Sequence, residues 1–299
     1  MTVHKDACEL PRFPSIIPPK RLDDYIYRAW SIYRFQYTKC NLTYSTDKLV
    51  AIQGIATWVS QVTGDEFVAG LWRSRIIEEL CWYRDIPGAE SSPWRAPSWS
   101  WASCDEGIRM CVTAHLHMQC ATRQIEAELV DLNVNAKTSG QLEAASMRIK
   151  CKLLYALLIP QSSAEWPGDP RHDSLELFSS EGDPTNSNLS SRLANLDVFS
   201  YIDIDDGRIP EPEYGYVSVI QYCAHASTSE IPEVTEDSDE QEDDGKYPGG
   251  RFEALFLKPC DEASQAFKRV GIISPMTART LRLVLKAHHM AEERVIILV

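Results

Sequence analysis

The sequence predicts an α+β protein in which a helical N-terminal region packs on a mainly antiparallel β-sheet, folded as a sandwich or an open barrel. Two observations lead to this prediction. Apolar residues recur at helical spacing in the first third of the chain and alternate with a period of two from Ser98 onward. Seven of the eight tryptophans fall between Trp30 and Trp101, so the composition changes at the same place. We therefore expect an N-terminal tail at 1–20, a helical region at 21–97 and a β-rich region at 98–299.

Three apolar stripes predict the helices of the N-terminal region. The first follows Pro18-Pro19, which suits a helix start, and the third ends at Pro87-Gly88. Ser45, Thr46 and Asp47 are N-cap candidates for the second. Such helices cannot bury their apolar faces alone, so they must pack on one another or on a sheet. The stripes are Leu22, Tyr25, Ile26, Ala29 and Tyr33; Leu49, Ile52, Ile55, Ala56 and Val59; and Phe67, Leu71, Ile76, Leu80 and Tyr83.

The segment Arg95–Ser103 (RAPSWSWAS) places two tryptophans and an Arg-Pro step within nine residues. Read as a strand that begins near Pro97, it directs Trp99 and Trp101 to one face. A paired-tryptophan face needs an opposing surface, either a filled seam between subdomains or an aromatic ligand pocket. The candidate ligand or seam residues are Arg95, Trp99, Trp101, Asp47 and Trp72.

The β-rich region is predicted from alternating apolar residues. The longest run, Met147–Ile159, has one apolar and one polar face, and Thr277–His289 is ambiguous between a strand and a short helix. Polar insertions at 161–195 and 227–250 interrupt the strands. The shorter predicted strands are Ile125–Val134, Val198–Ile204, Tyr214–Tyr222, Phe252–Leu257, Arg269–Ile273 and Val295–Val299.

Composition limits the classes of function. The net charge is −13, of which −8 lies in the insertion at 227–250, which we expect to be a solvated loop. No basic patch favours nucleic acid, and no apolar run approaches the length of a membrane span. Nine cysteines without a spacing pattern, and a segment 1–20 without the apolar core of a signal peptide, suit a reducing compartment. We expect a cytoplasmic protein with protein partners and with neither nucleic acid nor membrane as a partner.

Catalytic and metal signals are weak. Cys111, His115 and His117 have the side chains of a zinc site, but their spacing does not match paired ligands that flank a turn. The sequence contains no nucleophile elbow and no phosphate-binding glycine loop. We therefore predict no cofactor and assign no catalytic residue, which leaves enzymatic activity open and favours a protein that is not an enzyme.

Four ordered stretches resemble the part of fungal heterokaryon-incompatibility (HET) proteins that follows their HET domain. Arg95–Ser103 is similar to the PSWSW element of that family. The others are YTKCNLT at 37–43 with DKLVAIQGIA at 47–56, AGLW at 69–72 with LCW at 80–82, and LFLKP at 255–259 with FKRVG at 267–271. The resemblance covers about residues 25–105 well and the remainder loosely.

The resemblance implies a biological context. The family's N-terminal strand rich in Ser, Trp and Gly has no counterpart in residues 1–20, so the chain resembles a C-terminal portion without the HET domain. This implies a non-catalytic regulatory or interaction module in fungal nonself recognition and programmed cell death, whose partner could be a HET domain-bearing chain. The alternatives are a small-molecule-binding or hydrolytic enzyme with a pocket at the helix/sheet seam, and a truncated gene product without a separate function.

Overall fold

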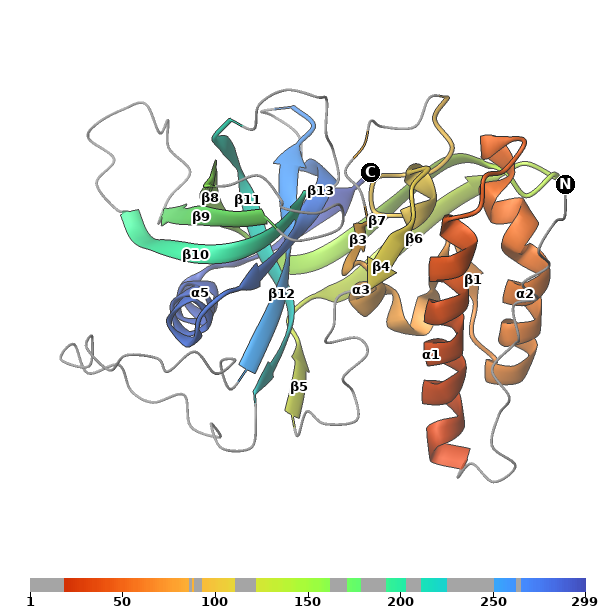
Figure 1. The fold of residues 1–299 in the computed structure, drawn as a ribbon, viewed down its shortest axis with the longest axis horizontal. Coiled ribbons are helices and arrows are strands. Elements are labelled where there is room, and N and C mark those ends of the chain that lie inside the picture. Colours follow the sequence, from red (N-terminus) through yellow and green to blue (C-terminus); the bar gives the residue numbers. More distant parts are fainter. Residues whose placement is uncertain are drawn as a thin grey trace, which may run out of the picture.

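The structure is a computed structural model whose described residues combine four α-helices with mostly antiparallel strands, in agreement with the α+β class (Figure 1). Helices α1 and α2 lie together at one side, and a barrel lies at the other. The residues that the structure describes are 19–85, 88, 93–110, 122–161, 171–178, 192–202, 211–224, 250–261 and 265–299.

The first two predicted helices are confirmed as α1 (Pro19–Thr38) and α2 (Lys48–Thr63), with a short 3₁₀ turn, η1 (Ser45–Asp47), before α2. Helix α2 ends where Gly64 adopts a left-handed conformation (φ 73°), which an amino acid with a side chain rarely takes. The predicted stripe of α2 faces inward, with Leu49, Ile52, Ala56 and Val59 buried.

The prediction of a third long helix is wrong. Its place is taken by a hairpin, β1 (Phe67–Val68) and β2 (Leu71–Trp72), whose turn at Ala69 and Gly70 has φ values of 49° and 98°. These left-handed conformations reverse the chain and are incompatible with a helix. The rest of the segment forms η2 (Arg73–Arg75), the single-turn α3 (Ile76–Glu79) and β3 (Trp82–Arg84), which pairs with β4 (Ile108–Met110).

Six antiparallel strands form a closed barrel, where the sequence predicted a sandwich or an open barrel. The ring runs β8–β9–β10–β13–β12–β11 and closes where β11 pairs with β8. Closure satisfies the backbone hydrogen bonds that the edge strands of an open sheet would expose. The strands are β8 (Leu154–Pro160), β9 (Arg171–Phe178), β10 (Arg192–Ile202), β11 (Glu213–Ala224), β12 (Gly250–Pro259) and β13 (Ala266–Pro275).

Further strands extend the sheet beyond the barrel. Strand β14 (Glu293–Leu298) runs parallel to β13, and β7 (Leu142–Lys152) and β6 (Glu128–Ala136) follow it in order, while β5 (Thr122–Ile125) pairs with β11. A single hydrophobic cluster contains residues of α1 and α2 together with residues of β7 and β14. A second cluster fills the barrel.

The long alternating run Met147–Ile159 is two strands and not one. Cys151 on β7 belongs to the cluster shared with the helices, whereas Leu154 and Ala156 on β8 belong to the barrel core. The chain changes from the outer sheet to the barrel at Leu153, and the buried positions change from odd to even numbers there. The sequence pattern hides this change because both parities are apolar around the junction.

The polar insertions were expected to lack secondary structure. For 161–195 this is wrong in part, because β9 and the first residues of β10 fall within it. Residues 162–170 and 179–191, and all of the acidic insertion except Gly250, lie outside the described residues. Within the described part of the chain, none of the helices combines the length and the apolar character needed to cross a membrane.

The ambiguous segment near the C-terminus is a helix, α5 (Ala278–Met290), which lies against the barrel (Figure 1). Thr277 caps its N-terminus by accepting a hydrogen bond from the Thr280 amide at 3.0 Å. Val284 and Leu285 reach into the barrel core. His288, near the other end, is fully buried, and its Nε2 lies 3.0 Å from Glu126 Oε2.

His288 predicts a pH dependence of stability. Burial lowers the pKa of His288, and this outweighs the opposing effect of Glu126, while Lys152 and His289 lower it further. Below a pH of about 6.5 the unfolded chain therefore binds a proton that the folded chain does not bind, so stability falls as pH falls. The variant His288→Gln can still donate a hydrogen bond to Glu126 but does not titrate. Its melting temperature should therefore fall less than that of the wild type when the pH is lowered from 7.5 to about 5.5. Equal falls in melting temperature for the two proteins over this pH range would show that His288 is not the cause.

Candidate functional site

The structure buries most of the residues that the sequence marked as site candidates. Trp72, Trp99 and Trp101 are fully buried in one hydrophobic cluster, and Arg95 is also buried. The predicted strand is wrong, since a turn at Ser98 and Trp99 leads directly into the 3₁₀ helix η3 (Trp101–Ser103). The Ser100 hydroxyl accepts a hydrogen bond from the Ala102 amide at 3.1 Å and so caps that turn.

Trp101 and its neighbour hold the β1–β2 turn. The indole Nε1 of Trp101 donates to the carbonyl oxygen of Gly70, and the hydroxyl of Ser100 donates to that of Ala69 at 2.6 Å. A Cβ atom on Gly70 would lie 2.8 Å from the indole nitrogen, so glycine is required there for contact as well as for its φ. Ser100 and Trp101 thus form a structural joint between two parts of the N-terminal region.

The same segment also contacts the end of the chain and the barrel. The Ser98 amide donates to the Val299 carbonyl at 3.0 Å, and the Ser98 hydroxyl accepts from the Arg269 amide at 3.0 Å. The Arg269 guanidinium, on β13, donates to the carbonyls of Leu80 and Trp82 and lies 3.8 Å from the centre of the Trp82 ring. Arg269 therefore links β13 to β3, a contact that no pattern in the sequence predicts.

The polar site candidates form hydrogen bonds or ion pairs with other residues of the chain. Arg95 donates from Nε to the Ala102 carbonyl and pairs with Asp105 at 2.5 Å. Asp47 makes no side-chain cap at α2; its Oδ1 accepts from Gln141 at 2.9 Å and so ties α2 to the β6–β7 turn. Lys48, next to Asp47, is also buried and donates to a backbone carbonyl, and this burial lowers its pKa.

A buried ion pair beside Trp72 was not predicted. Arg34 Nη1 lies 3.1 Å from Glu79 Oε1, and the other carboxylate oxygen accepts from the Trp72 amide at 3.0 Å. Burial raises the pKa of Glu79, and Arg34 opposes that effect. A signal was present in the sequence, because Arg34 continues the i, i+4 stripe of Ile26 and Trp30 and must therefore face the core.

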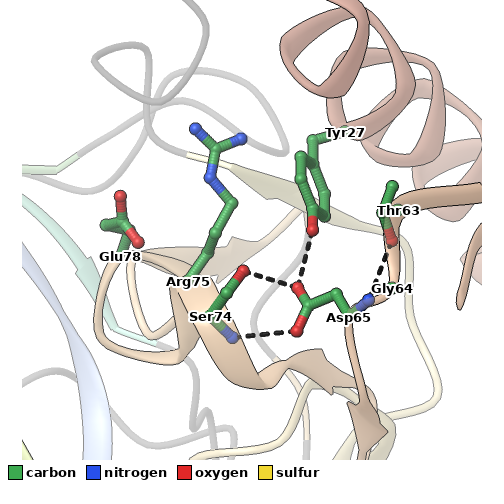
Figure 2. A pocket seen from close by; sticks show the side chains of 7 residues that line it. All are labelled: Tyr27, Thr63, Gly64, Asp65, Ser74, Arg75 and Glu78. Atoms are coloured by element: carbon green, nitrogen blue, oxygen red, sulfur yellow. Dashed lines mark hydrogen bonds between the residues drawn. The ribbon is translucent and has the colours of Figure 1, made fainter. Parts of the chain in front are cut away.

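An open pocket of about 460 Å³ lies between α1, the end of α2 and the η2–α3 segment (Figure 2). Within it, Asp65 accepts hydrogen bonds from the Tyr27 hydroxyl and the Ser74 hydroxyl at 2.6 Å each, and from the Ser74 amide at 3.0 Å. The Arg75 guanidinium lies 4.6 Å from the centre of the Tyr27 ring, and Glu78 lies at the opposite wall.

The pocket is suited to binding and poorly suited to base catalysis. Burial alone would raise the pKa of Asp65, but the hydrogen bonds from Ser74 and Tyr27 outweigh it and hold the pKa below its usual value. A carboxylate with a lowered pKa is a weak general base at neutral pH. Arg75 and Glu78 add one charge of each sign, so together with Asp65 the pocket is lined by two carboxylates and one guanidinium.

The weak zinc candidates Cys111, His115 and His117 lie outside the described residues. Among the residues that the structure describes, no group of three or more His, Cys, Asp or Glu side chains could hold a metal ion.

Comparison of the chain with protein-family models, with curated proteins and with solved structures finds no match. The resemblance to heterokaryon-incompatibility proteins therefore remains a prediction from the motifs.

Proposed function

We propose that the chain is a non-catalytic interaction module that binds a protein partner through the outer face of α2. The observation that carries the proposal is the composition of that face. Lys48 is the only charged residue of α2, and it is buried. Trp58 and Val62 are exposed to 48% and 44%. The remaining exposed residues of the helix are Ala51, Gln53, Gly54, Thr57 and Gln61.

An uncharged helix face with an exposed tryptophan has the chemistry of a protein interface. Aromatic residues are enriched and charged residues depleted at interface centres, because a partner desolvates them at low cost. Gly54 has nothing within 4 Å of the position of a Cβ atom, so a partner can approach the helix backbone closely there. The polar site candidates support the non-catalytic part of the proposal, since Arg95 and Asp47 are engaged in contacts within the chain.

The resemblance supplies the partner class and context for this proposal: a HET domain-bearing chain, regulated in the cytoplasm of a fungal cell during nonself recognition. Direct titration of the purified chain against a purified HET domain-bearing chain tests it. Trp58→Glu should abolish binding, because the charge would be buried unpaired at the interface. The melting temperature of the variant should stay near that of the wild type, since Trp58 is half exposed.

Trp94→Glu is the matched control. Trp94 is exposed to 50%, nearly the same as Trp58, but lies outside α2. Retained binding by Trp94→Glu and lost binding by Trp58→Glu would support the proposed interface. Equal binding by both variants would show that α2 is not the interface.

A second candidate function is binding of a small polar molecule in the pocket of Figure 2. The carboxylates of Asp65 and Glu78 suit a cationic group of such a molecule, and the guanidinium of Arg75 suits an anionic one. This differs from the pocket expected at the helix/sheet seam, where Trp99 and Trp101 are fully buried.

A further inference from the structure

A groove of about 640 Å³ lies on the outer face of the barrel, remote in sequence from α2. Its floor is formed by tyrosines of two adjacent strands, Tyr155 on β8 and Tyr214 and Tyr216 on β11. Tyr155 and Tyr216 are direct partners in the strand register, and Tyr214 lies two residues before Tyr216, so all three point to the same face. The neighbouring residues of β8 and β11 point into the barrel core instead.

The aromatic rings form a continuous surface. The rings of Tyr155 and Tyr214 are nearly parallel, with planes 9° apart and centres 6.0 Å apart. Tyr216 lies 5.4 Å from Tyr155 and 5.4 Å from Phe267, so the surface continues onto β13. Tyr214 is 41% exposed, whereas Phe267 is buried. The surface therefore offers an accessible aromatic ring, Tyr214, and extends to a buried ring, Phe267.

Polar side chains stand around this aromatic floor. Asp261, Gln265 and Arg294 line the groove, and its charged lining residues are one acid and one base. A rim of this kind does not select a charged ligand. It does offer both hydrogen-bond acceptors and donors, because a carboxylate only accepts, a guanidinium only donates and an amide does both.

We propose that this groove binds a neutral oligosaccharide. A pyranose ring presents C–H groups on its faces and hydroxyls around its edge. The C–H face packs on a tyrosine ring through dispersion, and each hydroxyl both donates and accepts, which the mixed rim satisfies. The volume and the aromatic lining with few polar groups are those of ligand sites in general.

Two other ligands of aromatic grooves fit less well. Single-stranded nucleic acid also stacks on tyrosines, but a chain with a net charge of −13 repels its phosphates. A proline-rich peptide offers mainly carbonyl acceptors and few donors, so it matches a rim of mixed acceptors and donors less well than sugar hydroxyls, each of which does both. The oligosaccharide uses every class of group that lines the groove.

Calorimetric titration of the full chain with maltohexaose, cellohexaose, laminarihexaose and chitohexaose tests the proposal. At least one should bind to the wild type. Tyr214→Ala should weaken that binding by about tenfold or more, equivalent to about 1.4 kcal/mol. Tyr214→Phe should keep most of the affinity, because it keeps the stacking ring. Tyr44→Ala, which removes a tyrosine that is 69% exposed elsewhere, is the matched control and should bind as the wild type does.

Failure of all four sugars to bind would overturn the proposal, as would equal binding by Tyr214→Ala and the wild type. Binding of a proline-rich peptide in the groove, without binding of a sugar, would assign the groove to a different ligand and would also overturn it. The result is independent of the interface proposed for α2, because Trp58→Glu should bind the sugar with wild-type affinity.

Discussion

Replacing Trp101 by alanine is expected to lower the free energy of unfolding by about 3–5 kcal/mol, which is a large part of the stability of a typical domain. The side chain is fully buried, and its loss leaves a cavity beside the β1–β2 turn. The Gly70 carbonyl also loses its hydrogen bond from the indole. Chemical denaturation followed by circular dichroism measures the change.

The matched control for this prediction is Trp58→Ala. Trp58 is the same residue type but is half exposed, so its replacement should change stability by only about 0.5 kcal/mol. If the tryptophan segment joins the helical region and the barrel into one cooperative unit, helix and strand signals should shift together in Trp101→Ala. A variant that keeps its melting temperature but loses binding of a ligand would place the ring in a functional pocket instead.

The sequence predicted elements well where local pattern and burial agree. The stripe Leu49, Ile52, Ala56 and Val59 faces the core because a helix of that length has one buried face. The same logic fails between Phe67 and Tyr83, because two left-handed residues at the β1–β2 turn break the helix and both faces of this segment are buried. A periodicity argument cannot identify a turn whose conformation is fixed by a distant indole.

Tertiary contacts decide the features that the sequence could not predict. Closure of the barrel depends on pairing between β10 and β13, which are separated by two other strands in the sequence. The role of Arg269 depends on the carbonyls of Leu80 and Trp82, almost 190 residues away, and no local pattern indicates such a contact. In the tryptophan segment, the residue types correctly indicated burial, but the backbone is a turn because Ser98 hydrogen-bonds to the end of the chain.

The groove on the barrel is a proposed binding site that the sequence could predict only in part, because tertiary contacts complete it. Tyr214 and Tyr216 share one face of a predicted strand, so the sequence placed these two side chains together. Tyr155 was expected on the buried face of one long strand, whereas it lies half-buried on the outer face of β8. Only the change of strand at Leu153 brings it beside the other two.

Replacing Arg34 by methionine is expected to destabilise the protein by about 3–5 kcal/mol, because it leaves the Glu79 carboxylate buried without its counter-charge. The surface pair of Arg73 and Glu66 is the matched control. Its side chains are 45% and 60% exposed, so Arg73→Met should cost about 1 kcal/mol or less. Equal losses for the two variants would show that the buried pair does not hold the β2–α3 segment.

The pH dependence identifies the cause of the loss in Arg34→Met. Burial raises the pKa of Glu79, and removal of Arg34 takes away the main effect that opposes it. The folded variant then binds a proton at a pH where the unfolded chain, with a glutamate pKa near 4.5, does not. Relative to the wild type, which shares the contribution of His288, its stability should therefore rise as pH falls from 7 to about 5, since the state that binds more protons is favoured. Adding Glu79→Gln should recover much of the stability at neutral pH and remove this pH dependence, because the amide oxygen still accepts from the Trp72 amide and carries no charge. A double variant as unstable as Arg34→Met would instead assign the loss to the packing of the Arg34 side chain.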